Sequence, residues 1–105
     1  MDRLDLPQGT LDLLILKALS LTPMHGWAIS ERIHQVSRAT LQIPQGSLYP
    51  ALHRLERSGL VASDVELAQG RRRRTYSLTA QGRKEFATQR RDWQRYANGM
   101  QAVIA

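Results

Sequence analysis

The spacing of the apolar residues changes at Gly59 from helical to extended, and that change limits the possible folds more than any other feature. Before Gly59 apolar residues recur every three or four positions, which is typical of helices packed on one face. In residues 60–67 they begin to alternate with polar ones, residues 68–70 form a turn signal, and residues 71–78 resume an extended pattern. The sequence therefore predicts a mainly α fold with a small β-hairpin.

The first of the expected helices covers residues 11–19, with Thr10 as its N-cap and Asp12 favourably placed in its first turn. Its apolar residues occupy most of its circumference, so this helix is predicted to lie at the centre of the core. Pro23 ends it, because the residue before a proline is disfavoured in helical conformation.

A second helix is expected after the segment at residues 25–27. Ile29, Ile33 and Val36 recur at helical spacing with polar residues between them, which predicts one buried face. The following residues 38–43 alternate in polarity and suggest either a short strand or an extended linker.

The third helix is expected from residue 45 to Ser58, with Gly59 as its C-terminal stop. If Ser47 caps this helix, Pro50 falls in the first turn, where its missing N–H costs little. One narrow sector of the helix is apolar and predicted to face the core. It consists of Leu48, Leu52 and Leu55.

The opposite sector of the third helix combines small, rigid, aromatic and basic residues. They are Gly46, Ser47, Tyr49, Pro50, His53, Arg54 and Arg57. An ordinary solvated surface would also carry charges, but it requires neither a tyrosine nor a proline near the helix start, and Glu56 is the only acid in this helix. A recognition helix needs such residues, because they allow close approach to DNA and supply donors for base edges and phosphates.

The charge of the chain supports a nucleic-acid partner. The formal net charge is +6, and residues 1–52 carry four basic and four acidic groups, whereas residues 53–105 carry eleven basic and five acidic groups. A basic excess concentrated in one part of a protein favours association with polyanions, since binding releases counterions. An anionic membrane surface would also attract it.

The second extended segment begins with four consecutive arginines. They are Arg71, Arg72, Arg73 and Arg74. Alone, such a run would equally suit RNA or a membrane surface. Directly after a helix-turn-helix layout, it predicts a wing that contacts the phosphate backbone or inserts an arginine into the minor groove.

Four segments give a closer match, at residues 9–16, 24–29, 46–56 and 76–82. Together they resemble the PadR family of bacterial transcriptional regulators over nearly the whole chain. The Gly-Ser-Leu-Tyr-Pro-Ala-Leu sequence within the third segment is the most specific part. Two departures are that Trp27 stands where many members have tyrosine, and that the wing is richer in arginine than is usual.

The resemblance implies a winged helix-turn-helix protein that acts as a homodimeric repressor. Such a protein would bind a palindromic operator in double-stranded DNA and be released by a small-molecule effector or other signal. Residues 1–78 would form the DNA-binding domain and residues 79–105 a C-terminal dimerisation helix, in one structural domain.

The last segment independently suggests dimerisation. Thr79 is expected to cap a helix over residues 80–104, which would extend about 37 Å, longer than a small core can cover. Large apolar residues recur along it with a heptad-like spacing. They are Phe86, Trp93, Tyr96, Met100 and Val103, and they are predicted to form the dimer interface. The alternative is a helix that folds back or breaks near Asn98 and Gly99.

Trp93 has a second interpretation. It is similar in position to an aromatic residue that stacks on planar ligands at the dimer interface of multidrug-sensing members. Trp93 is therefore a candidate effector-binding residue, for example for a small aromatic effector. A purely structural role in the interface remains the alternative.

Catalysis, metal binding and cofactors find no support. The three histidines form no ligand pair at helical spacing, the chain has no cysteine, and no phosphate-binding glycine loop is present. The longest apolar stretch, residues 13–16, is far shorter than a membrane span, and we expect a cytoplasmic protein. The rival hypothesis is a winged-helix module for protein interaction or nonspecific DNA architecture, without an operator.

Overall fold

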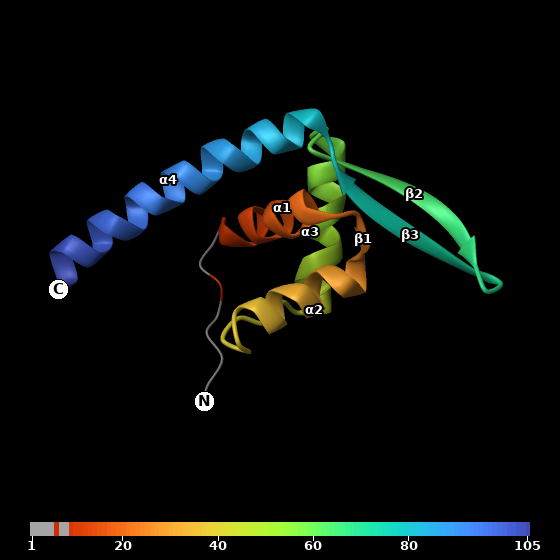
Figure 1. The fold of residues 1–105 in the computed structure, drawn as a ribbon, viewed down its shortest axis with the longest axis horizontal. Helices are drawn as coiled ribbons and strands as arrows, with labels where there is room; N and C mark the ends of the chain where they lie inside the picture. The colour runs from red at the N-terminus through yellow and green to blue at the C-terminus, as the bar shows by residue number, and fades with distance from the viewer. Residues whose placement is uncertain (1–5, 7–8) are drawn as a thin grey trace.

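The computed structural model describes Leu6 and residues 9–105. Four helices and three strands occur in this part of the chain (Figure 1). In order they are α1 (Thr10–Leu21), β1 (Met24–His25), α2 (Gly26–Val36), α3 (Gln45–Arg57), β2 (Val61–Ala68), β3 (Arg71–Leu78) and α4 (Ala80–Ile104). The predicted fold, mainly helical with a small β-hairpin, is confirmed.

Helix α1 lies at the centre, with α2 and α3 packed against it, because it is apolar on most sides. It begins one residue earlier than expected: Gly9, in left-handed conformation, is the N-cap, and Thr10 is the first helical residue. The three helices and the start of the hairpin share one core. Its fully buried large side chains are Ile15, Leu16, Leu19, Ile29, Leu48, Leu52 and Val61.

One predicted core residue is not buried. Val36 is 72% exposed, although Ile29 and Ile33 of the same face are buried. Val36 is the last residue of α2, and the chain turns away within three residues, where Arg38 and Ala39 have positive φ. The last turn of α2 therefore extends past the elements that cover its earlier turns.

The segment between α2 and α3 forms no extended strand. Residues 38–43 are irregular, with a single bridge position at Leu41, and Ile43 is buried in the core. Arg38 and Ala39 both have positive φ, which marks a tight turn rather than extended chain. The segment is therefore a linker and not a strand, but its first half is a turn and not the extended chain that the sequence suggested.

Helix α3 starts earlier than its sequence suggests. Pro44 is the N-cap, so Ser47 lies in the first turn and Pro50 is the sixth residue of the helix, beyond that turn. The expected cap at Ser47 is therefore wrong. Pro50 leaves the Gly46 carbonyl without its intrahelical donor, and Gly46 is exposed, so this carbonyl is open to solvent and the missing bond costs less. The helix ends as expected, with Gly59 at a φ of 78°.

The hairpin forms a three-stranded antiparallel sheet with β1, in the order β1-β3-β2. Ala68 pairs with Arg71, so Gln69 and Gly70 form a two-residue turn, and both have positive φ. Such a turn matches the natural twist of two antiparallel strands. The strand β1 was not predicted, because two residues have no recognisable period.

Helix α4 is continuous through Asn98 and Gly99, so the alternative of a break there is wrong. Thr79 caps it as predicted, accepting a hydrogen bond of 2.9 Å from Gly82 N–H. The helix start lies so close to the sheet that a Cβ on Gly82 would be 2.1 Å from the Leu60 carbonyl oxygen. From there α4 leaves the body in the direction opposite to the hairpin (Figure 1), which contributes to a longest extent of 54 Å.

Candidate DNA-binding surface

The exposed face of α3 contains all seven residues that the sequence placed on it. Gly46, Ser47, Tyr49, Pro50, His53, Arg54 and Arg57 are exposed. The three leucines of the opposite face and Ala51 are buried against α1 and α2. Burial of one face of an amphipathic helix orients the other, so the core itself presents these polar and basic groups to solvent.

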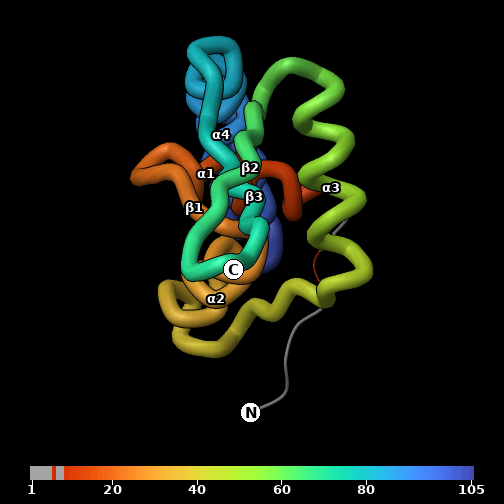
Figure 2. The backbone as a smooth tube through the Cα atoms, turned by 90° about the vertical axis from the view of Figure 1, so that its right-hand side faces the viewer, coloured from red at the N-terminus to blue at the C-terminus, as the bar shows by residue number. Residues whose placement is uncertain are grey.

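The wing separates its four arginines by strand alternation. Arg72 and Arg74 share a strand face with Tyr76, which is buried, whereas Arg71 and Arg73 lie on the other face. Figure 2 shows the hairpin pointing toward the viewer with α3 running along one side of it. The four arginines therefore do not form one uniform patch, and only two stand on the face that continues into the core.

A hydrogen-bond chain ties the wing to α3. Ser63 Oγ donates to Glu56 Oε2 at 2.6 Å, and Arg74 Nη1 donates to Ser63 Oγ at 2.9 Å. Beside it, burial raises the pKa of the Tyr76 phenol; the positive charge of Arg74 lowers it, and Glu56 raises it. The Tyr76 hydroxyl is therefore protonated at neutral pH, and Arg74 is engaged by its own chain.

Arg54 also has a partner within the chain. Its Nη2 lies 2.6 Å from Asp12 Oδ1 on α1, with the two side chains 53% and 25% exposed. Among the α3 residues predicted to contact DNA, Arg54 is thus the one whose side chain is directed toward α1. Sequence reasoning missed this pair, because 42 residues separate its members.

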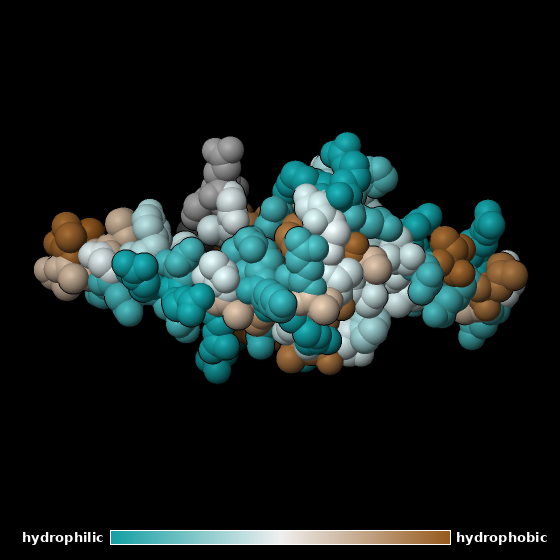
Figure 3. Space-filling view, turned by 90° about the horizontal axis from the view of Figure 1, so that it is seen from above, coloured by the Kyte–Doolittle hydropathy of each residue, from teal (hydrophilic) through white to brown (hydrophobic). Residues whose placement is uncertain are grey.

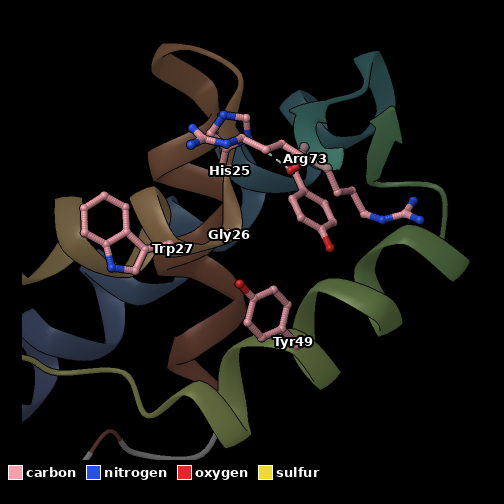
Figure 4. A pocket seen from close by; sticks show the side chains of 7 residues that line it. His25, Gly26, Trp27, Tyr49 and Arg73 are labelled. Carbon is pink, nitrogen blue, oxygen red and sulfur yellow. Dashed lines mark hydrogen bonds between the residues drawn. The ribbon is translucent and has the colours of Figure 1, made fainter. Parts of the chain in front are cut away.

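A cleft of about 600 Å³ opens between the start of α2, the start of α3 and β3 (Figure 4). It is lined by His25, Gly26, Trp27, Tyr49, Arg73, Arg74 and Tyr76. Sequence reasoning missed His25 and Trp27 as members of this surface. The sequence feature that could have revealed Trp27 is its position in the first turn of an amphipathic helix, outside the apolar face of that helix.

Tyr49 is fixed in place by the glycine opposite it. A Cβ on Gly26 would lie 2.7 Å from Tyr49 Cε1, so the ring packs directly on the backbone of α2. The ring nevertheless remains partly exposed and lines the cleft. Tyr49 therefore joins the two helices of the helix-turn-helix and still faces outward.

The residues predicted for dimerisation divide into two groups. Phe86 packs against the core of its own chain, with the Lys17 ammonium 6.0 Å from its ring centroid. The other four, Trp93, Tyr96, Met100 and Val103, are exposed along the far half of α4. Figure 3 shows hydrophobic residues gathered at both ends of the long axis, at the end of α4 and near the hairpin tip.

A second cleft, of about 510 Å³, lies between the start of α1 and α4. Trp93 and Tyr96 form one wall, with ring centroids 5.7 Å apart, and Asp12 and Asp92 contribute carboxylates. Asp12 is also the partner of Arg54, so the same carboxylate borders this cleft and contacts α3.

Within the part of the chain that the structure describes, no group of three or more metal-ligating side chains occurs. None of the helices described is both long and apolar enough to span a bilayer.

Three packed helices, an exposed basic third helix and a basic antiparallel hairpin directly after it define a winged helix-turn-helix, a class of DNA-binding protein. Residues 15–88, more than half of the chain, match the Transcriptional regulator PadR-like family, and the chain belongs to that family. It is accordingly a DNA-binding transcriptional regulator and not an enzyme.

Known relatives agree with this assignment. The transcriptional regulator Rv3488 of Mycobacterium tuberculosis is 41% identical over 69 residues, which are 65% of this chain and 61% of that protein. A transcriptional regulator from Clostridium thermocellum superposes with a TM-score of 0.87 at 26% identity, covering 93% of this chain and 96% of the other. A PadR family transcription regulator from Clostridium difficile R20291 gives 0.79 at 26% identity, covering 92% and 100%.

Proposed function

We propose that this chain is a homodimeric repressor that binds a palindromic operator in the cytoplasm and is released by a small effector. The observation that supports it most directly is the exposed, basic face of α3 beside an arginine-rich wing. DNA contacts are assigned to the exposed residues of both elements. These are Gly46, Ser47, Tyr49, Pro50, His53, Arg54, Arg57, Arg71, Arg72, Arg73 and Arg74. Residues 1–78 would bind DNA and residues 79–105 would dimerise.

Dimerisation is supported by the far half of α4. Val103 is 85% and Ile104 is 69% exposed, and Trp93, Tyr96 and Met100 are exposed on the same helix. A stripe of this kind is costly in water and is removed when a second copy covers it. A twofold dimer would present two α3 helices related by symmetry, which is why we expect the operator to be palindromic.

Effector release is supported by the cleft between α1 and α4. Two aromatic rings beside two carboxylates favour a planar aromatic cation, since ring faces and carboxylates both attract positive charge. A cation that binds Asp12 would compete with Arg54 of α3. This competition offers a direct route from Trp93 to the recognition helix. The alternative is that Trp93 serves only the dimer interface.

The test of the proposed function is a gel-shift titration at about 150 mM salt, where nonspecific phosphate binding is weakened. The protein is titrated on the DNA upstream of its own gene and on a shuffled duplex of equal length. We expect a discrete dimer complex on the upstream DNA, with at least about 10³-fold preference. Equal binding to both duplexes would instead favour a nonspecific architectural module.

A further inference from the structure

We propose that the cleft between α2, α3 and β3 binds one backbone phosphate of the operator, together with its deoxyribose, through Arg73, Trp27 and Tyr49. The inference rests on the proposed operator binding and adds a specific site to it. Neither His25 nor Trp27 belongs to the DNA-contact residues assigned above. The ligand is a phosphodiester of duplex DNA rather than a free nucleotide or inorganic phosphate.

The chemistry of the lining favours an anion. Its polar side-chain groups are the guanidinium groups of Arg73 and Arg74, the indole N–H of Trp27, the phenols of Tyr49 and Tyr76, and the imidazole of His25. All of these can donate a hydrogen bond, and no carboxylate is among them. A phosphodiester accepts hydrogen bonds and donates none, so this set of groups matches its requirements.

The side-chain donors of Arg73 and Trp27 are available for a ligand. No hydrogen bond or ion pair of the Arg73 side chain is formed within residues 9–105, although Glu66 stands opposite in the strand register. Trp27 is 63% exposed, and its indole N–H has no acceptor in the described chain. Arg74 differs, since it donates to Ser63 and has a structural role in the wing.

The walls of the cleft are held by contacts that do not involve a ligand. Gly26 lets the Tyr49 ring rest on the start of α2, and His25 Nδ1 lies 3.3 Å from the Arg74 carbonyl oxygen. Because a carbonyl only accepts, this bond requires a proton on Nδ1. The strand β1 ends at His25, so the edge of β3 beside Arg73 is unpaired and the cleft opens there. A site organised in advance loses less entropy on binding.

A neighbouring cleft shows why the phosphate is assigned to this one. The neighbour, of about 450 Å³, lies further along α3 and is lined by His53, Glu56, Arg57, Arg74 and Tyr76. It contains the carboxylate of Glu56, which would repel a phosphate, whereas no carboxylate lines the larger cleft. The DNA backbone is therefore expected to pass on the side of the wing where β1 and Trp27 lie.

The first test is a scan of the operator with single neutral methylphosphonate substitutions, one backbone position at a time. At one backbone position, the methylphosphonate should lower the affinity of the wild-type protein roughly tenfold. The same substitution should leave the affinity of Arg73→Gln almost unchanged, because this variant has already lost the contact. Arg71→Gln is the matched control, because Arg71 belongs to the same run but does not line the cleft. It should weaken binding overall yet remain sensitive at that position. Trp27→Phe, which keeps a ring but removes the N–H, should lose about fivefold and show reduced sensitivity there.

The second test uses the fact that the chain has two tryptophans. Trp27→Phe keeps Trp93 in place, so the part of the emission change that the wild type shows and Trp27→Phe lacks reports on Trp27, and saturating operator should shift or quench that emission. Inorganic phosphate and a mononucleotide, at equal ionic strength, should leave the emission unchanged. A response to these small anions would mean a free-anion site and would overturn the assignment to DNA.

The two proposals fail in different ways. If operator binding is specific but Arg73→Gln and Trp27→Phe lose no sensitivity at any single phosphate, the cleft is not a phosphate site and operator recognition stands. An unchanged Trp27 emission on the operator would lead to the same conclusion. If the wild type binds operator and shuffled DNA equally, the proposed function itself is wrong.

Discussion

The wing and the far half of α4 both project from the same small body, in opposite directions, but they differ in chemistry. The hairpin carries four arginines in β3 beside two exposed apolar side chains, Val65 and Leu67, whereas the end of α4 presents a longer apolar stripe of Trp93, Tyr96, Met100 and Val103. Cations remain well solvated until phosphates replace the water, while exposed aromatic and aliphatic side chains are stabilised when a protein surface covers them. The comparison indicates that one projection is suited to DNA and the other to a second copy of the chain.

The largest effect should come from placing a charge on the α4 stripe. Met100→Asp would bury a carboxylate in the expected dimer interface, so we expect monomers and a loss of at least about a hundredfold in operator affinity. Asn98→Asp is the matched control, since it adds the same charge on the opposite side of α4 and should leave the dimer intact. Sedimentation velocity and gel shifts measure both. If Met100→Asp still forms a dimer, the far half of α4 is not the dimer interface, and the contrast between the two projections is wrong.

Neutralising the wing should affect DNA binding and leave assembly unchanged. Replacing Arg72 and Arg73 by Gln should weaken binding to every duplex by roughly ten- to a hundredfold and reduce the salt-dependence slope by about two. The measurement is a titration at several salt concentrations. An unchanged slope would place both arginines away from DNA.

The exposed face of α3 should control sequence preference rather than overall affinity. His53→Ala should reduce discrimination between operator and mutated operator by about 1–3 kcal/mol if its ring reaches a base edge. Tyr49→Ala is less informative, because it removes a ring that packs on Gly26 and lines the proposed phosphate cleft, so His53 gives the cleaner result. Equal losses on both duplexes would contradict a role in base recognition.

The smallest of the expected effects is the loss of folding stability when the ion pair between Asp12 and Arg54 is removed. Because both side chains retain contact with solvent, Asp12→Asn should lower the free energy of unfolding by less than about 1 kcal/mol, measured by urea denaturation. Its effect on regulation should be larger. A planar aromatic cation that releases the wild type from DNA should release Asp12→Asn less, and equal release would separate this carboxylate from the effector response.

Much of the fold could be predicted from the sequence because its signals are local. The leucine spacing of α3, the cap at Thr79 and the turn at Gln69 and Gly70 each depend on residues within a few positions of one another. The same locality explains the errors at Ser47 and Val36. Capping and burial at a helix end depend on where the chain goes next, which a periodic pattern does not contain.

The sequence by itself determined the order of the elements, the two faces of α3 and the basic character of the wing, since periodicity and composition specify them. Only the tertiary structure decided that Arg54 contacts Asp12, that Arg74 is linked through Ser63 to Glu56, and that Trp27 and Arg73 line one cleft. Two of these pairs, Asp12 with Arg54 and Trp27 with Arg73, are more than 40 positions apart. Such contacts arise from the packing of whole elements, which no local pattern specifies.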